Sequence, residues 1–161
     1  MIAYIPDARD LNKKPLTAFK PLFASLSPPE LEYLPGMYEA GFTGPAWLRK
    51  AAVPSIALGG LGGWWGKEFG AEGGTNLVLR EGQMQRIFPF LSVQTASAID
   101  GKPTITVRYT IECPFPWPHI FDELREIEPG RLLGMTVVDA PGLRRMAIPF
   151  LLERRENDGG L

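Results

Sequence analysis

Apolar and polar residues alternate most regularly in residues 104–112. The apolar members of this segment are Ile105, Val107, Tyr109 and Ile111. Because successive side chains of a β-strand point to opposite faces, this alternation predicts a strand with one apolar face. The sequence allows two locations for the apolar face of this strand. It either lines the interior of a barrel or packs against helices from the N-terminal segment.

Other segments of the chain also have the composition of strands separated by turns. They are residues 36–42, 64–69, 76–80, 83–90, 91–99, 132–139 and 145–153. Asp100 and Gly101 form the strongest hairpin signal, because both residue types tolerate positive φ. About eight strands with short connections predict an antiparallel meander that closes on itself, which removes its exposed edges. A closed barrel of that size fills its interior with side chains or holds one small ligand.

Helical patterns are confined to short segments. Residues 1–35 are expected to be helical and irregular, and residues 27–30 (Ser-Pro-Pro-Glu) resemble a capping box before a short helix at residues 30–34. Another short helix is expected after Pro45, and residues 119–126 are predicted to form about two helical turns before the last strands.

These elements predict a mainly β fold. We expect a lipocalin-like antiparallel β-barrel with short N-terminal helices and one short helix before the last strands. We expect a single domain over residues 1–161, with a helical segment at 1–35, the barrel at 36–154 and a frayed tail at 155–161.

Composition narrows the classes of function. The net charge of −1 argues against a general nucleic-acid binder, which needs a basic face. Cys113 is the single cysteine, so no intrachain disulfide can form. The first residues lack the pattern of a signal peptide, and no apolar run approaches the ~20 residues that span a bilayer. We therefore expect a cytoplasmic protein without a membrane span, and a homodimer is left open.

Residues 62–69, Gly-Gly-Trp-Trp-Gly-Lys-Glu-Phe, contain the pattern Gly-x-Trp-x-Gly. Further motifs occur in order at residues 23–26 (Phe-Ala-Ser-Leu), 34–38 (Leu-Pro-Gly-Met-Tyr), 122–125 (Asp-Glu-Leu-Arg), 133–135 (Leu-Gly-Met) and 149–154 (Pro-Phe-Leu-Leu-Glu-Arg). Together they resemble the GXWXG family of lipocalin-like proteins, in which this domain is paired with a C-terminal domain of unknown function. The resemblance covers residues 19–154 and implies a lipocalin-like fold without implying an activity.

Several aromatic and polar side chains are candidates for ligand binding. Trp64 and Trp65 are adjacent, so on a strand they face opposite sides, one filling the barrel and the other covering it or lying at its mouth. Lys67 is expected to share the face of Trp65 and to be solvated. Tyr109 offers a hydroxyl to a ligand if its row lines the interior, and Glu39 is a candidate inward carboxylate.

His119, Asp122 and Arg125 form the most promising polar cluster, because their spacing of three places them on one side of the predicted helical turns. His119 could act as an acid or base near neutral pH, Asp122 could orient it, and Arg125 could hold an anionic or carbonyl oxygen. The alternative is structural: Arg125 closes one end of the barrel and Asp122 pairs with it.

No metal or cofactor motif is present, since one histidine and one cysteine cannot make an ordinary zinc site and no phosphate-binding loop occurs. The leading hypothesis is therefore a protein that binds an apolar or aromatic small molecule in the barrel. One alternative is a cofactor-independent isomerase, cyclase or dehydratase acting on a hydrophobic natural product in the same cavity. Another is an interaction module that docks through the corner at residues 114–117.

Overall fold

The computed structural model describes residues 8–155, and its eight strands form one closed antiparallel barrel. The strands are β1 (Gly36–Phe42), β2 (Trp64–Phe69), β3 (Gly73–Arg80), β4 (Gln83–Ala96), β5 (Pro103–Tyr109), β6 (Ile120–Glu128), β7 (Arg131–Val138) and β8 (Ala147–Arg155). Each strand pairs with the next along the chain, and β8 pairs with β1. The predicted antiparallel meander that closes into a barrel is confirmed.

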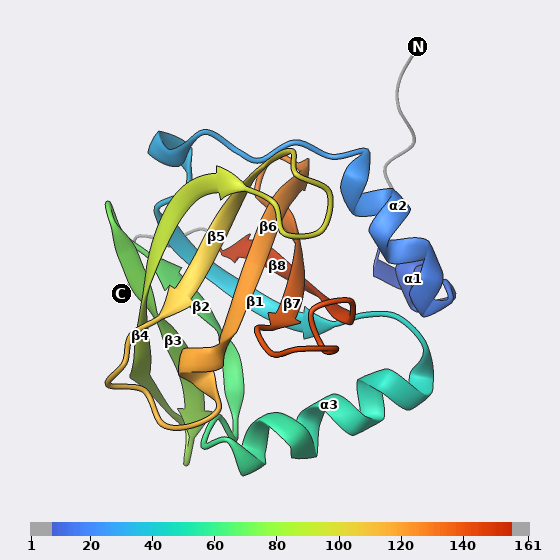
Figure 1. The fold of residues 1–161 in the computed structure, drawn as a ribbon. Helices are drawn as coiled ribbons and strands as arrows, with labels where there is room; N and C mark the ends of the chain where they lie inside the picture. Colours follow the sequence, from blue (N-terminus) through green and yellow to red (C-terminus); the bar gives the residue numbers. More distant parts are fainter. Residues whose placement is uncertain (1–7, 156–161) are drawn as a thin grey trace.

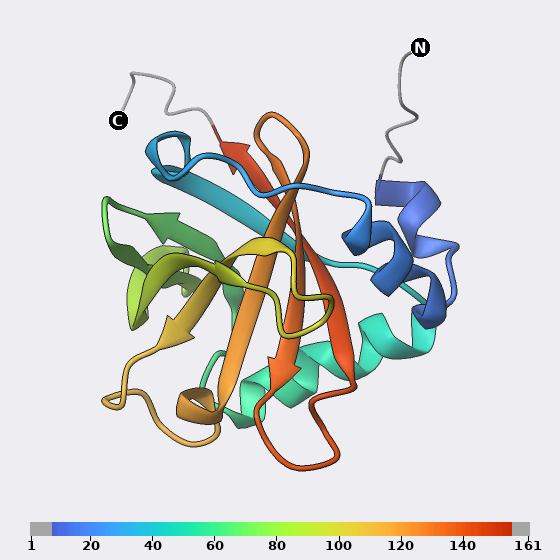
Figure 2. The same ribbon diagram turned by 45° about the horizontal axis from the view of Figure 1, so that its top comes forward.

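Helices lie at the ends and on one side of the barrel (Figures 1 and 2). The longest, α3 (Ala46–Leu58), runs across one end, and the chain that leads into β1 crosses the opposite end. The shorter α1 (Ala8–Asn12) and α2 (Phe19–Ala24) lie outside the barrel wall. Three-residue 3-10 helices occur at Leu16–Ala18, Leu31–Tyr33 and Trp117–His119. No helix among the described residues is long and apolar enough to cross a membrane.

Two apolar clusters hold these parts together. The inner cluster fills the barrel with residues from all eight strands, including Tyr38, Phe69, Phe90, Ile105, Val107, Leu124, Leu132 and Phe150. The outer cluster joins Leu11, Phe19 and Phe23 of the N-terminal helices to the outward-facing residues Phe121, Leu133, Met135, Val137 and Leu151. Burial of both faces explains why β7 has an almost continuous run of buried residues.

The prediction of a helix at residues 119–126 is wrong, because this segment forms most of β6. Its inward positions include Ile120, Asp122 and Leu124, while Phe121 and Arg125 face outward. A two-turn helix is only marginally stable on its own, whereas in the barrel the same backbone groups pair with β5 on one side and β7 on the other.

Three smaller predictions are also corrected. Residues 83–90 and 91–99 belong largely to the single strand β4, which continues through Pro89. The strand predicted at 104–112 ends at Tyr109, so Ile111 is 91% exposed instead of extending the apolar row. The expected capping box does not form, since Ser27 makes a β-bridge with Glu126 and no side chain caps the following 3-10 helix. The tail predicted at 155–161 lies outside the described residues apart from Arg155.

Candidate functional site

A cavity of about 300 Å³ lies between α3 and the end of the barrel that this helix crosses. Its helical wall consists of Leu48, Ala51, Ala52, Ser55, Ile56 and Gly59. These positions recur every three or four residues, so they form one face of α3. The small side chains in the middle of this face leave space above the barrel, and Leu48 is the buried residue that anchors the helix.

Aromatic side chains form much of the barrel side of the cavity. They are Phe42, Trp64, Tyr109, Trp117 and Phe150. The Trp64 ring packs against Phe42 and Phe150 at centroid distances of 5.6 and 5.8 Å. Trp117 packs against Tyr109 at 5.3 Å and donates a hydrogen bond of 2.7 Å from Nε1 to the Gly59 carbonyl at the end of α3. This wall suits a flat apolar molecule.

One side of the cavity is polar, because Tyr109, Asp122 and Thr136 line it. Behind them lie Lys67 and Asn76, which are 1% and 0% exposed. These five side chains, the buried polar network, come from β2, β3, β5, β6 and β7. They face one another because each occupies an inward position of its strand, so closure of the barrel brings them together.

Lys67 is the centre of the buried polar network. Its ammonium Nζ lies 2.7 Å from the Tyr109 hydroxyl, 2.9 Å from Asn76 Oδ1 and 3.3 Å from Asp122 Oδ2. The charge also lies over the rings of Trp64, Phe90 and Tyr109, with centroid distances between 4.9 and 5.6 Å. The ammonium therefore has three acceptors for its three protons, as a buried charge requires.

Asp122 provides the negative charge. Its Oδ2 accepts a hydrogen bond of 3.0 Å from the Tyr109 hydroxyl, and its Oδ1 accepts one of 2.8 Å from Thr136. Burial lowers the pKa of Lys67, and the Asp122 charge acts in the opposite direction. Burial also raises the pKa of Tyr109 well above its usual value, and Asp122 raises it further. Tyr109 is thus a neutral phenol at physiological pH, and its hydroxyl donates a hydrogen bond to Asp122.

A β-bulge explains why Lys67 points into the barrel. Trp64 pairs with Val78 while Gly66 pairs with Leu77, so Trp65 is an extra residue in β2. The extra residue reverses the expected alternation, and Lys67 shares the inward side with Trp64. The expectation of a solvated Lys67 is therefore wrong. Trp65 is half-buried and is not among the residues that line the cavity.

The structure does not bring His119, Asp122 and Arg125 together. The strand conformation of β6 places Asp122 inside the barrel and Arg125 on its outer side. His119 precedes the strand, is exposed, and packs its ring against Phe115 at 5.9 Å. In the corner at residues 114–117, Phe115 is 80% exposed whereas Trp117 is buried.

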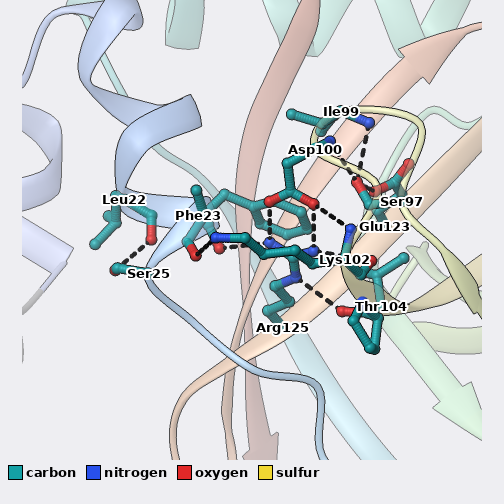
Figure 3. Close-up of polar contacts among 12 residues, drawn as sticks. Leu22, Phe23, Ser25, Ser97, Ile99, Asp100, Lys102, Thr104, Glu123 and Arg125 are labelled. Carbon is teal, nitrogen blue, oxygen red and sulfur yellow. Dashed lines mark hydrogen bonds and ion pairs between the residues drawn. The ribbon is translucent and has the colours of Figure 1, made fainter.

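Arg125 lies far from the cavity, where the β4–β5 turn meets the N-terminal segment (Figure 3). Its guanidinium makes a bidentate ion pair with Asp100, with distances of 2.6 and 2.7 Å. It also donates to the carbonyl oxygens of Phe23, Lys102 and Pro103 and stacks over the Phe23 ring at 4.2 Å. The guanidinium is fully buried and joins elements of the fold at this site, and Arg125 is not among the residues that line the cavity.

Because of the Asp100–Arg125 pair, we expect the stability of the fold to decrease at acidic pH. The hydrogen bonds from Arg125 lower the pKa of Asp100 from 3.8 to about 2. Between these values the unfolded chain binds more protons, so the stabilisation is present above about pH 4 and is lost as the pH falls to about 2. We expect the difference in unfolding free energy between the wild type and Asp100→Asn to shrink over this interval in urea titrations. A difference that stays constant down to pH 2 would contradict this assignment.

Glu39 does not provide an inward carboxylate. In β1 the side chains of Tyr38, Ala40 and Phe42 pack on the inner cluster, so Glu39 faces outward and pairs with Arg155 of β8. Sequence reasoning missed Lys67, Asn76 and Thr136. The available signal was that Lys67 and Asn76 are polar residues in strands that also carry several apolar residues, since buried polar groups need partners.

The comparisons with known proteins support the fold only. No protein-family model and no curated protein matches the chain. A solved structure, a protein from Thermomonospora curvata, is similar with a TM-score of 0.67 and 18% sequence identity, covering 87% of each chain. The chain is therefore an eight-stranded antiparallel β-barrel with a cavity at one end, and its resemblance to the GXWXG family stays a prediction from the sequence.

Proposed function

We propose that this protein binds a small, largely apolar molecule in the cavity between α3 and the barrel. The observation that carries the proposal is the cavity itself, which combines aromatic walls with one buried polar network. Its volume of about 300 Å³ is at the lower end of the range for small-molecule sites. We also propose that the chain belongs to the GXWXG family, and this membership is supported by sequence motifs alone.

The α3 face allows a direct test of this proposal. Ala52 lines the cavity, so Ala52→Leu places three more carbon atoms in the space that a ligand would occupy. We expect the affinity for an environment-sensitive hydrophobic dye to fall by at least about tenfold, which corresponds to about 1.4 kcal/mol. Fluorescence titration measures the affinity, and thermal unfolding shows whether the variant is folded.

Ala57→Leu is the matched control, because Ala57 is an exposed residue of the same helix that does not line the cavity. We expect this variant to bind the dye as the wild type does. Equal dye affinity for Ala52→Leu and the wild type would place the dye outside the cavity and count against the proposed site.

A second candidate function is a cofactor-independent isomerase, cyclase or dehydratase. The specific observation is that the Asp122 carboxylate and the Tyr109 hydroxyl, 3.0 Å apart, both line the cavity. Such a pair can exchange a proton with a bound molecule, with Tyr109 in the position that sequence reasoning gave to His119. Native mass spectrometry of freshly purified protein would identify a bound molecule. Its conversion by the wild type, and not by Asp122→Asn, would establish the enzyme, whereas conversion by both would exclude this pair.

A further inference from the structure

We infer that the cavity selects a neutral molecule carrying a hydroxyl or N–H group, which donates a hydrogen bond to Asp122 or Thr136. This inference rests on the proposed binding function and specifies the class of ligand. It follows from the direction of the hydrogen bonds around the cavity, which leave acceptors and no side-chain donors for a ligand among the described lining residues.

Each side-chain donor on the cavity wall is already used by the protein. Tyr109 and Thr136 donate to Asp122, and the indole Nε1 atoms of Trp64 and Trp117 donate to the carbonyls of Gly66 and Gly59. Ser55 donates to the Ala51 carbonyl within α3. No other lining residue carries a side-chain donor. A ligand that only accepts hydrogen bonds would have to break one of these bonds.

Acceptor positions, in contrast, are left over on the polar side. A carboxylate offers about four acceptor positions, and Asp122 uses three of them, for Tyr109, Lys67 and Thr136. The Thr136 hydroxyl has two lone pairs and accepts no hydrogen bond from the described part of the chain. Both residues line the cavity, so one donor group of a ligand can reach Asp122 Oδ1 or Thr136 Oγ1.

Charge decides between neutral and ionic ligands. Lys67 already neutralises Asp122, at 3.3 Å and at 1% exposure, so the site has no net charge to attract a cation. A carboxylate ligand would place a second negative charge beside the Asp122 carboxylate and lose its hydration in the apolar cavity. A neutral hydroxyl or N–H group avoids both costs and satisfies the remaining acceptors.

Three naphthalene derivatives of similar shape test the inference at neutral pH. 2-Naphthol can donate a hydrogen bond, 2-methoxynaphthalene can only accept one, and 2-naphthoate is an anion. Because a hydrogen bond to a charged group is stronger than one between neutral groups, we expect 2-naphthol to bind roughly tenfold to hundredfold more tightly than the other two. Isothermal titration calorimetry with the full-length protein gives the affinities. The methyl ether is the more apolar molecule, so burial of apolar surface alone would favour it over the naphthol.

Asp122→Asn should reduce the preference for 2-naphthol over 2-methoxynaphthalene to less than about threefold, since the charge is lost and the amide can donate to the ether. If this variant does not fold, the double variant Lys67→Met/Asp122→Asn tests the same point without a buried unpaired ammonium. Ile148→Val is the control, because Ile148 is an apolar lining residue and its loss should weaken both ligands alike.

The outcomes separate the inference from the binding proposal. Equal binding of the naphthol and its methyl ether, or tightest binding of the naphthoate, would overturn the donor inference while binding itself is upheld. A preference that survives unchanged in Asp122→Asn would also overturn it. Failure of all three molecules to bind would overturn both.

Discussion

Asp122→Ala is expected to lower the free energy of unfolding by about 3–5 kcal/mol, because it leaves a buried charge without its counter-ion. Lys67 is 1% exposed and would retain only Asn76 and Tyr109 as hydrogen-bond acceptors, while Tyr109 and Thr136 would lose their acceptor. At about 2–4 °C per kcal/mol for a domain of this size, the melting temperature should fall by roughly 6–20 °C. Thermal and urea unfolding measure both quantities.

The double variant Lys67→Met/Asp122→Asn is the matched control. It removes both charges, and the new amide still accepts from Tyr109, so we expect it to be more stable than Asp122→Ala. An Asp122→Ala protein that is as stable as the wild type would show that the ion pair does not stabilise this barrel.

The pH dependence of Asp122→Ala distinguishes an unpaired charge from a simple cavity. Burial lowers the pKa of Lys67, and Asp122 opposes this, so removal of Asp122 lowers that pKa further. A lysine whose pKa is lower in the folded state loses its proton more readily there, so folding becomes more favourable as the pH rises. The stability gap between the variant and the wild type should therefore narrow as the pH rises above neutrality. A gap caused only by lost packing would not change with pH.

The barrel could be predicted because its signals are local. Alternation at residues 104–109, the Asp100-Gly101 turn and the regular spacing of turn residues each depend on a few neighbouring residues. Closure then follows from the need to pair strand edges. The same local rules failed at β6, where the backbone hydrogen bonds come from strands that are distant in the sequence.

The site was predicted only in part, for the same physical reason. Trp64, Tyr109 and Asp122 were named from residue type and face, and all three line the cavity. Lys67 was missed because the bulge at Trp65 reverses the alternation of β2, and this bulge depends on pairing with β3. The proposed partnership of Asp122 with His119 was wrong because it assumed a helix. A helix places residues three apart on the same side, whereas a strand places them on opposite sides. Which polar residues meet inside a barrel depends on register, which one sequence does not specify.

The helix that covers the cavity and the helices on the outer wall of the barrel differ in how they pack. At the cavity end, α3 contributes one buried residue, Leu48, and carries exposed apolar residues such as Trp47 and Leu58. Outside the barrel wall, the N-terminal helices pack Phe19 and Phe23 into the outer cluster, and Arg125 ties Phe23 to the β4–β5 turn. This arrangement separates the element that stabilises the fold from the element that covers the proposed binding site.

Arg125→Ala tests this separation, and its expected effect is a loss of about 3–5 kcal/mol of stability with unchanged ligand binding. The substitution removes a fully buried guanidinium together with its ion pair to Asp100 and its hydrogen bonds to three backbone carbonyls. Arg131→Ala on β7 is the matched control, because Arg131 makes partly exposed ion pairs with Glu128 and Glu153 that are worth at most about 1 kcal/mol. Urea unfolding and dye titration, measured at a temperature at which each variant is folded, give the two quantities separately. If Arg125→Ala kept its stability and lost dye binding, Arg125 would be a ligand anchor, and the separation of the stabilising contacts from the binding site would be wrong.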